Sequence, residues 1–363
     1  MHGKIALVTL ESALKTGARV DRILSEWQGT DTCAVSVTCP RFGSGEGKAI
    51  LRDSVRDRDV YILLDVCNPS LTYKMFGETN RMSPDDHYQD LKRVIAACNG
   101  KADRITVIMP FLYEGRQHRK VLRESLDCAV MLRELENMGV HSILTFDAHD
   151  PRMQNVVPLM SMENVSPALQ FTQAMLTEYE DLIIDSEHMM FIAPDEGATE
   201  RVVFLATLFG VNIGMFYKRR DYGRIVNGSN PVIAHDFCGG TVKGKDVIIV
   251  DDMISSGGSM LDTSRQLKEM GARRVFIFST FGLFTSGLDA FDRAFDEGLF
   301  DRVFTTNLIY QTPELLSREY YFSVHMDRYI AALIDTINRG EAIYELIRPA
   351  PRIHQAIAVY QDR

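Results

Sequence analysis

The stretch that decides the fold reads Val247-Ile248-Ile249-Val250-Asp251-Asp252-Met253-Ile254-Ser255-Ser256-Gly257-Gly258-Ser259-Met260. Its β-branched beginning is typical of a buried parallel strand, which we predict over Val247–Val250. The residues from Leu261 to Met270 have the apolar spacing of a helix. A strand, a turn of small residues and a helix in this order are characteristic of α/β sheets. The two carboxylates would then stand at the carboxyl end of the strand, where such sheets bind ligands.

The turn between this strand and helix has two interpretations. It can be a plain connection, because Gly and Ser are common where the chain changes direction. It can also bind an anion, because Ser255–Ser259 offers hydroxyls, backbone N–H groups and the positive end of a helix. Asp251 and Asp252 favour the second interpretation, since adjacent carboxylates can accept ribose hydroxyls or hold a magnesium ion. The stretch has neither a Walker Gly-Lys-Ser/Thr nor a Gly-x-Gly-x-x-Gly fingerprint.

Length and composition limit the classes of protein to consider. With 363 residues the chain is long for one core and sufficient for two domains. The formal net charge of −9 argues against a nonspecific nucleic-acid binder, so we expect no nucleic-acid partner. No signal peptide and no apolar run of membrane-spanning length are evident, so we expect no membrane association. The six cysteines lack Cys-x-x-Cys spacing, which predicts reduced thiols and a cytoplasmic location.

Short β-branched runs alternate with amphipathic stretches, which predicts an α/β fold of parallel sheets flanked by helices. The predicted strands are Lys4–Thr9, Val60–Asp65, Arg104–Met109, Ser142–Asp147, Met189–Ala193, Asn212–Tyr217, Val247–Val250, Arg274–Ser279 and Arg302–Thr306. The predicted helices are Ala13–Gln28, Asp85–Asn99, Leu126–Met138, Pro167–Glu178, Ala198–Phe209, Met260–Met270 and Met326–Gly340. A helix and a short basic turn precede both Arg104 and Arg274, which indicates two related halves that meet near residues 160–166.

Five further segments carry polar residues at predicted strand ends or turns. They are Arg41-Phe42-Gly43-Ser44-Gly45-Glu46, Tyr113-Glu114-Gly115-Arg116-Gln117, Asp147-Ala148-His149-Asp150, Pro194-Asp195-Glu196-Gly197 and Lys218-Arg219-Arg220. Arg116 suits a polyphosphate, and His149 between two acids suits a metal ion. Plain alternatives are a solvated charged turn for Arg116, a helix cap for Asp195 and a core position for Phe42. The three cations precede a long polar loop through Gly240, which indicates a lid over a polyphosphate.

Taken together and in order, these six segments resemble the ribose-phosphate pyrophosphokinase (PRPP synthetase) family, over residues 30–346. The resemblance implies two phosphoribosyltransferase-like (type I PRTase) α/β domains related by a pseudo-twofold axis. Residues 1–164 would form the ATP side, residues 165–346 the ribose 5-phosphate side, and residues 347–363 a C-terminal extension without an assigned role. It also implies a homo-oligomer whose ATP site is shared between subunits.

The activity that the resemblance implies is transfer of the β,γ-diphosphoryl group of ATP to the 1-hydroxyl of ribose 5-phosphate. The products would be PRPP and AMP, and the cofactor would be Mg²⁺. The implied residues are Lys218 and Arg220 for catalysis; Phe42, Ser44, Glu46, Arg116 and Gln117 for ATP; Asp251, Asp252, Ser255, Ser256, Gly257, Gly258 and Ser259 for ribose 5-phosphate; and His149 and Asp195 for the metal.

The chain also departs from the family pattern. Ser44 replaces an acid that is common there, and the phosphate loop reads Ser-Ser-Gly-Gly-Ser rather than Asp-Thr-x-Gly-Thr. The segments Met75–Asp86 and Asp181–His188 have no family counterpart that we can place. Two alternatives therefore remain, a non-catalytic regulatory homologue and a PRPP-dependent phosphoribosyltransferase. The intact Lys218-Arg219-Arg220 counts against the first, and the chain length counts against the second.

Overall fold

The structure is a computed structural model that describes residues 2–98, 100–220 and 232–362. The chain divides into two compact units. The first contains Met1–Pro167, Asn307–Tyr310 and His325–Arg348, and the second contains Ala168–Thr306, Gln311–Val324 and Pro349–Arg363. The chain passes from the first unit to the second after Pro167, near the predicted boundary, but residues 325–348 belong to the first unit again. Residues 349–363 belong to the second unit rather than forming a separate extension.

The first unit is built on a parallel sheet with the strand order β10-β9-β8-β5-β1-β2. Its strands are β1 (Ile5–Thr9), β2 (Ala34–Val35), β5 (Asp59–Leu63), β8 (Arg104–Ile108), β9 (Ser142–Phe146) and β10 (Ser161–Val165). Its helices are η1 (Glu11–Ala13), α1 (Leu14–Gln28), α2 (Pro84–Cys98), α3 (Asp127–Asn137), η2 (Pro151–Val156), α9 (Asp327–Asn338) and α10 (Tyr344–Ile347).

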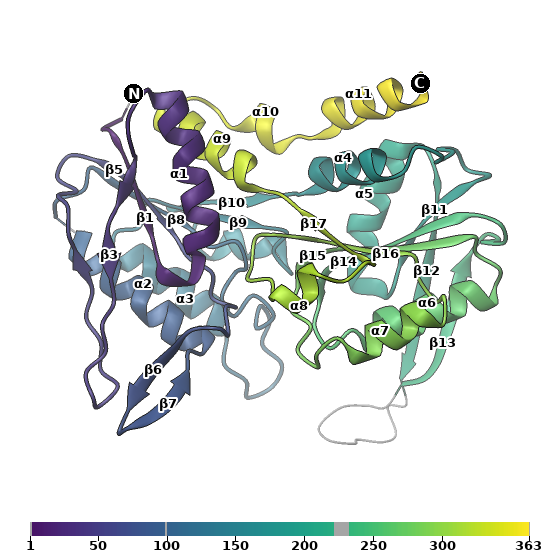
Figure 1. Cartoon of the computed structure of the whole chain (residues 1–363), viewed down its shortest axis with the longest axis horizontal. Helices are drawn as coiled ribbons and strands as arrows, with labels where there is room; N and C mark the ends of the chain where they lie inside the picture. The colour runs from purple at the N-terminus through teal and green to yellow at the C-terminus, as the bar shows by residue number, and fades with distance from the viewer. Residues whose placement is uncertain (1, 99, 221–231, 363) are drawn as a thin grey trace. The chain divides into compact units, whose positions relative to one another are not determined.

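Helices cover both faces of this first sheet. On one face, α2 and α3 contribute buried residues such as Leu91 and Leu132 to a core that includes Val107 of β8. On the other face, Tyr329 of α9 meets Phe146 of β9 edge to face, with ring centroids 6.3 Å apart. Helix α1 lies beside α9 (Figure 1). Because both faces are covered, the central strands are apolar throughout, as parallel strands usually are.

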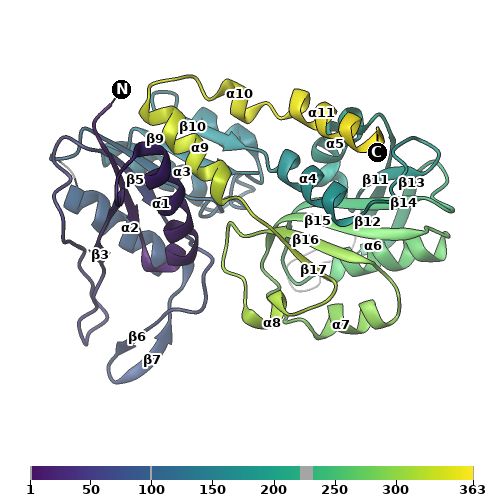
Figure 2. The same cartoon turned by 45° about the horizontal axis from the view of Figure 1, so that its top comes forward.

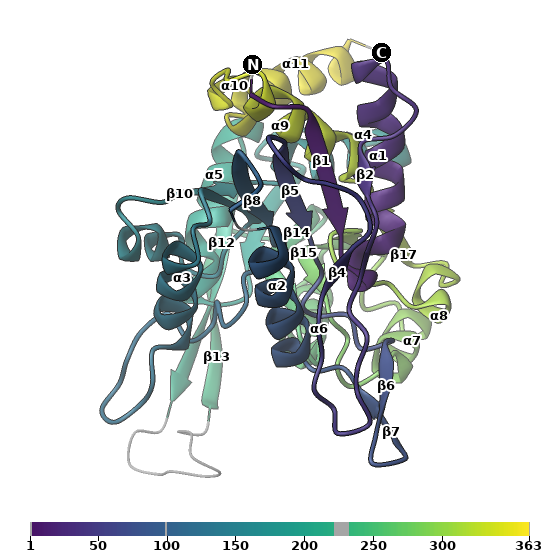
Figure 3. The same ribbon diagram turned by 90° about the vertical axis from the view of Figure 1, so that its left-hand side faces the viewer.

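Two small hairpins also belong to the first unit. One pairs β3 (Val37–Thr38) with β4 (Ile50–Leu51), and the other pairs β6 (Thr72–Met75) with β7 (Glu78–Arg81). The β6–β7 hairpin projects from the unit (Figure 3). Its turn residues Phe76 and Gly77 both have positive φ, 50° and 85°, which matches the twist of paired strands. The predicted insertion Met75–Asp86 is therefore largely this hairpin, followed by the start of α2.

The second unit has a seven-stranded sheet with the order β13-β12-β11-β14-β15-β16-β17, parallel except for the β12–β13 pair. Its strands are β11 (Met189–Ala193), β12 (Asn212–Arg220), β13 (Val232–Gly239), β14 (Asp246–Ile254), β15 (Arg274–Gly282), β16 (Arg302–Thr306) and β17 (Tyr321–Val324). Its helices are α4 (Ala168–Glu178), η3 (Glu196–Ala198), α5 (Thr199–Phe209), α6 (Gly258–Glu269), α7 (Asp289–Asp296), α8 (Pro313–Leu316) and α11 (Ala350–Gln361).

The second sheet is also covered on both faces. Helices α6 and α7 share a core with one face, where Phe291 is fully buried. Helix α4 covers the other face, where Phe171 stacks on Phe278 of β15 with ring centroids 5.1 Å apart. The C-terminal helix α11 lies along α4 (Figure 2). Among the described residues, none of the helices combines the length and the apolar character that crossing a bilayer requires.

Three predictions in the second unit need correction. Strand β14 runs to Ile254, so Asp251 and Asp252 lie within the strand rather than after it. The predicted loop through Gly240 contains β13, which pairs antiparallel with β12, while residues 221–231 of that loop lie outside the described residues. The tail after Leu346 contains α11. Acidic and polar residues have low strand propensity, so the pairing of neighbouring strands, rather than propensity, extends these strands.

Both sheets have the same strand arrangement. In the first sheet β1 lies between β2 and β5, and in the second β11 lies between β12 and β14, with the antiparallel β13 added outside β12; the later strands follow in chain order. The strand order therefore reverses between β1 and β5 in one sheet and between β11 and β14 in the other. Open α/β sheets bind ligands at this reversal, beyond the carboxyl ends of the strands.

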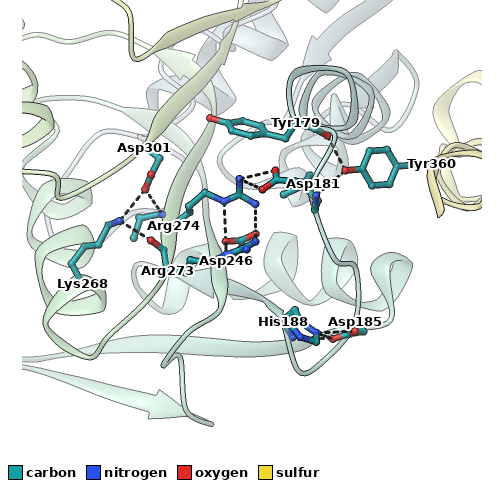
Figure 4. Close-up of polar contacts among 12 residues, drawn as sticks. Tyr179, Asp181, Asp185, His188, Asp246, Lys268, Arg273, Arg274, Asp301 and Tyr360 are labelled. Carbon is teal, nitrogen blue, oxygen red and sulfur yellow. Dashed lines mark hydrogen bonds and ion pairs between the residues drawn. The ribbon is translucent and has the colours of Figure 1, made fainter. Parts of the chain in front are cut away.

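An ion cluster holds the opposite, amino end of β14 (Figure 4). The fully buried carboxylate of Asp246 accepts two hydrogen bonds each from Arg273 and Arg274, at 2.5 to 3.0 Å. Arg274 also donates to Asp181, at 2.8 and 3.1 Å. Tyr360 of α11 accepts a hydrogen bond from the backbone N–H of Leu182 and donates to the carbonyl of Tyr179, both at 2.8 Å. The segment Asp181–His188 is thus tied to both β15 and the C-terminal helix.

Candidate active site

Three carboxylates lie near one another at the strand-order reversal of the second sheet. Asp195 follows the end of β11 in the turn into η3, and Asp251 and Asp252 lie on the adjacent strand β14. Both acids of β14 lie beyond its last pairing with β11, Ile192↔Ile249. Burial, together with the negative charges of Asp252 and Asp195, raises the pKa of Asp251 well above its usual range. Such a group favours a ligand that supplies a positive charge or hydroxyl donors.

The hydrogen bonds of these acids set their orientation. Asp252 is only 3% exposed, and its backbone N–H donates to the Asp251 carboxylate at 2.9 Å. The guanidinium of Arg201, on α5, lies 3.9 Å from Oδ2 of Asp252. Asp195 accepts a hydrogen bond from the backbone N–H of Gly197 at 3.0 Å and so caps η3. Contacts with β14 itself, with η3 and with α5 therefore hold these acids within the second unit.

The anion-binding loop predicted after β14 leads directly into α6. The helix begins at Gly258, earlier than predicted, so its first backbone N–H groups belong to the loop. Ser256, Gly258 and Ser259 are exposed, and Ser255 is half-buried. Gly257 has a φ of 88°, in the left-handed region that favours glycine. The loop thus presents hydroxyls and helix N–H groups beside the acids of β14.

The predicted catalytic cations lie at the end of β12. The backbone of Lys218 pairs with His235 of β13, and that of Arg220 pairs with Val232. The side chains of both cations lie outside what the structure describes. Their catalytic role therefore stays a prediction.

In the first unit, the loop after β8 carries the predicted ATP contacts. Arg116 is exposed, and the side-chain amide of Gln117 donates to the carbonyl of Ser125 at 3.1 Å. The backbone N–H of Gln117 donates to the carbonyl of Glu114, which closes a tight turn at 2.8 Å. Glu114 has a φ of 55°, and strain of this kind is common at ligand-binding positions.

His149 follows β9 and lies against this same loop. Its ring centroid is 5.2 Å from that of His118, with the two planes tilted by 60°. The adjacent Asp150 accepts side-chain hydrogen bonds from Arg152 at 2.6 and 2.9 Å, which lower the pKa of Asp150 to about 2. Two imidazoles and a carboxylate with a lowered pKa therefore lie beside the Arg116-Gln117 turn.

The turn predicted to reach adenine is the tip of the β3–β4 hairpin. Phe42 is 54% exposed, so the alternative of a core position is wrong. Ser44 Oγ donates to Glu46 at 2.8 Å, and Lys48 Nζ lies 5.6 Å from the Phe42 ring centroid. The backbone N–H of Phe76 donates to the Gly43 carbonyl at 2.8 Å, so the inserted β6–β7 hairpin supports this turn.

The structure brings together some of the predicted residues and not others. It joins Asp195 with Asp251 and Asp252, and it joins His149 with the loop of Arg116. The predicted metal pair His149 and Asp195 is divided between the two units, each of which is described by itself. In the described ranges, no three His, Cys, Asp or Glu side chains are arranged to hold a metal ion.

Sequence reasoning missed His118 and Arg201. His118 directly follows the Arg116-Gln117 pair, and Arg201 lies in the predicted helix Ala198–Phe209, but neither lies at a strand end, and their partners are distant in the chain. Only the contact of His118 with His149 and the approach of Arg201 to Asp252 single them out.

Comparison with known proteins agrees with two successive α/β units. The family model described as the N-terminal domain of ribose phosphate pyrophosphokinase matches residues 5–139. The model described as a phosphoribosyl transferase domain matches residues 169–298. Together the two models span well over half of the chain, in the same order as the two sheets.

Curated relatives and a solved structure match the chain along most of its length. A ribose-phosphate pyrophosphokinase of Vibrio parahaemolyticus is 28% identical over 307 residues, which cover 84% of this chain and 88% of the relative. One of Mycoplasma pneumoniae is 29% identical over 281 residues, covering 76% and 77%. The phosphoribosylpyrophosphate synthetase structure from Mycobacterium smegmatis shares the fold, with a TM-score of 0.75 and 22% identity, over 93% of this chain and 99% of that one. On these matches, the chain belongs to the ribose-phosphate pyrophosphokinase family.

Proposed function

We propose that the chain is a ribose-phosphate diphosphokinase, a transferase that converts ATP and ribose 5-phosphate into AMP and PRPP. The observation that carries the proposal is the Asp251-Asp252 pair at the strand-order reversal, directly before the Ser255–Ser259 loop. Carboxylates can accept the ribose hydroxyls, and the loop with the first turn of α6 can bind the 5-phosphate. The second unit thus offers binding groups for both the ribose and the phosphate of ribose 5-phosphate.

Catalysis of this reaction depends on positioning the two substrates and on stabilising the charge of the transferred group. The 1-hydroxyl of ribose 5-phosphate attacks the β-phosphorus of ATP, the bond to the α-phosphate oxygen breaks, and AMP leaves with the bridging oxygen. The hydroxyl proton passes to a base that we do not assign. Negative charge grows on the transferred group, and we assign Lys218 and Arg220 to stabilise it from the end of β12.

The remaining assignments concern ATP. Arg116 and Gln117 are assigned to its phosphates, because their loop lies at the carboxyl end of the first sheet. Phe42, Ser44 and Glu46 are assigned to adenine on an exposed hairpin tip. An exposed aromatic residue there suits a site completed by a second copy, so we propose a homo-oligomer with a shared ATP site.

Mg²⁺ is the proposed cofactor, with His149 and Asp195 as its protein ligands. The residues near Asp195 fit a hard cation, because they are carboxylate oxygens, and burial followed by the charges of Asp252 and Asp195 raises the pKa of Asp251. Mg²⁺ usually takes one or two protein ligands and completes its shell with substrate phosphates and water. When bound, it would neutralise phosphate charge, while Asp251 and Asp252 orient the sugar.

A cytosolic location stays part of the proposal. All six cysteines are free thiols. Burial raises the pKa of Cys39 and Cys128 to about 12 and that of Cys98 to about 11, and it raises the pKa of Cys67 well above its usual value, which disfavours the reactive thiolate.

The direct test is AMP release from ATP by the purified full chain at saturating Mg²⁺, with and without ribose 5-phosphate. We expect AMP only when ribose 5-phosphate is present, with PRPP formed in equal amount. A PRPP-dependent transferase or a non-catalytic homologue would form no AMP from these two substrates. No sugar-dependent AMP would therefore refute the proposed function.

A further inference from the structure

We propose that the β6–β7 hairpin positions the turn of residues 42–46, so that Tyr73, Met75 and Phe76 act as positioning residues for ATP. The inference rests on the proposed function in one respect, because that function assigns the turn to adenine. The hairpin makes up most of the segment Met75–Asp86, which has no counterpart that we can place in the family pattern. All residues of the argument lie in the first unit.

The hairpin turns one of its faces toward the rest of the unit. Tyr73 and Met75 are half-buried, whereas Thr72 and Lys74 are exposed. Successive side chains of a strand point to opposite faces, so Tyr73 and Met75 lie on the same face of β6. This face contacts the turn of residues 42–46 and the arginine before it.

The ring of Tyr73 helps to hold Arg41, whose side chain is only 7% exposed. Asp90 of α2 accepts two hydrogen bonds from the Arg41 guanidinium, at 2.5 and 3.0 Å. The guanidinium carbon lies 5.3 Å from the centroid of the Tyr73 ring, within the range of a cation–π interaction. Arg41 directly precedes Phe42 and forms an antiparallel bridge with Gly47. Fixing Arg41 therefore fixes both ends of the turn.

The tip of the hairpin contacts the middle of the turn, and the two tips lie side by side (Figure 1). The backbone N–H of Phe76 donates to the carbonyl of Gly43 at 2.8 Å. A Cβ added to Gly45 would lie 2.7 Å from Sδ of Met75, so Met75 packs directly against the backbone of Gly45. Hairpin residues thus contact the turn at its start, at Gly43 and at Gly45.

The turn benefits from this support because it contains two glycines. Its own backbone bonds run from the N–H of Phe42 to the carbonyl of Glu46, at 2.7 Å, and from the N–H of Gly45 to the carbonyl of Phe42, at 2.9 Å. Glycine loses more conformational freedom on ordering than other residues do. A ligand that must order such a turn binds less tightly, whereas a turn ordered in advance avoids this loss. The hairpin therefore raises nucleotide affinity without touching the nucleotide.

The test is calorimetric binding of the α,β-methylene analogue of ATP, which the proposed reaction cannot cleave, to the full chain. Tyr73→Ala should weaken binding by about fivefold or more, because the ring beside Arg41 is lost. Tyr73→Phe keeps the ring and should bind like the unsubstituted protein. A second variant replaces residues 73–80 by Asn-Gly, which can join the paired residues Thr72 and Arg81 in a two-residue turn. It should lose about tenfold or more in affinity.

The matched control is Lys74→Ala, which changes an exposed residue of the same strand and should leave the affinity unchanged. In turnover, Tyr73→Ala should raise KM for ATP but change neither KM for ribose 5-phosphate nor kcat. This split separates positioning from a general loss of stability, which thermal unfolding measures in each variant.

Unchanged analogue affinity in Tyr73→Ala, or no analogue binding by the unsubstituted protein, would overturn the inference. A lower melting temperature with unchanged affinity would overturn it too, since the hairpin would then only stabilise the fold. Sugar-dependent AMP release by the unsubstituted protein decides the proposed function separately, because the binding test needs no turnover.

Discussion

The ring of Phe291 occupies the space that a side chain on Gly257 would need. A Cβ at Gly257 would lie 2.2 Å from the ring atom Cε2 of Phe291, which is fully buried on α7. The φ of 88° at Gly257 adds a second constraint against any side chain. The path of the proposed phosphate loop is therefore set by the core of the second unit.

Gly257→Ala should lower both stability and ribose 5-phosphate affinity. Gly244→Ala is the matched control, because Gly244 has a φ of 76° but a Cβ added there would meet nothing within 4 Å. Strain should cost each variant about 1 kcal/mol or more, and the clash at Gly257 should add about 1 to 3 kcal/mol. Calorimetry of ribose 5-phosphate binding and thermal unfolding check this. Equal melting temperatures for the two variants would contradict the role of Phe291.

Asp251→Asn should stabilise the second unit and weaken ribose 5-phosphate binding. The raised pKa of Asp251 means that its ionised form is disfavoured in the folded state. Its contribution to stability is present at low pH, below the unfolded-state pKa, and is lost as pH rises through the folded-state pKa. The variant should therefore melt at a higher temperature at neutral pH, by about 2 to 4 °C for each kcal/mol of stability gained. Under acidic conditions its melting temperature should change little. A lower melting temperature of the variant at neutral pH would contradict the repulsion between Asp251 and the carboxylates of Asp252 and Asp195.

Arg274→Ala should destabilise the second unit strongly. Asp246 is fully buried, and loss of one of its two arginines leaves it with half of its hydrogen bonds. Breaking a buried pair costs about 3 to 5 kcal/mol. The control Arg265→Ala removes an ion pair with Glu297 in which both side chains are 52% exposed, worth about 1 kcal/mol or less. Urea unfolding measures both, and similar losses would contradict the importance of burial.

Lys218→Ala should lower turnover by about 10²-fold or more, by removing a cation that stabilises the transition state. Lys243→Ala, which changes an exposed lysine in the same unit, is the control and should leave turnover unchanged. The measurement is sugar-dependent AMP release under saturating substrates. An unchanged rate in Lys218→Ala would remove this residue from the catalytic set.

Asp65 should make the stability of the first unit depend on pH. Burial raises its pKa to about 7, although the backbone N–H groups of Cys67 and Tyr310 donate to it at 2.8 and 2.7 Å. The stability contributed by its protonated form is complete below about pH 4 and is lost as pH rises to about 7. Asp65→Asn should flatten this slope in unfolding experiments across that range. An identical slope in the variant would assign the pH dependence to other groups.

The main strands were predictable because their apolar periodicity is local. Met189–Ala193 and Arg302–Thr306 have the predicted bounds, since every residue of β11 and nearly every residue of β16 is buried. Strand β14 was predicted too short, because Asp251 and Asp252 do not resemble strand residues. Only the neighbouring strand β15, which pairs through Ile254↔Gly282, extends it.

The sequence by itself determined the alternation of strands and helices, the two α/β halves and the order of the six motifs. These are properties of short segments, whose periodicity shows which side of each segment is apolar. The tertiary structure alone decided that α9 joins the first unit and α11 the second, and that His118 meets His149. Such contacts depend on which strands become neighbours in a sheet, and no local pattern specifies that choice. The Asp251-Asp252 stretch thus predicted a ligand site, and the strand order of the second sheet decided that Asp195 would stand beside it.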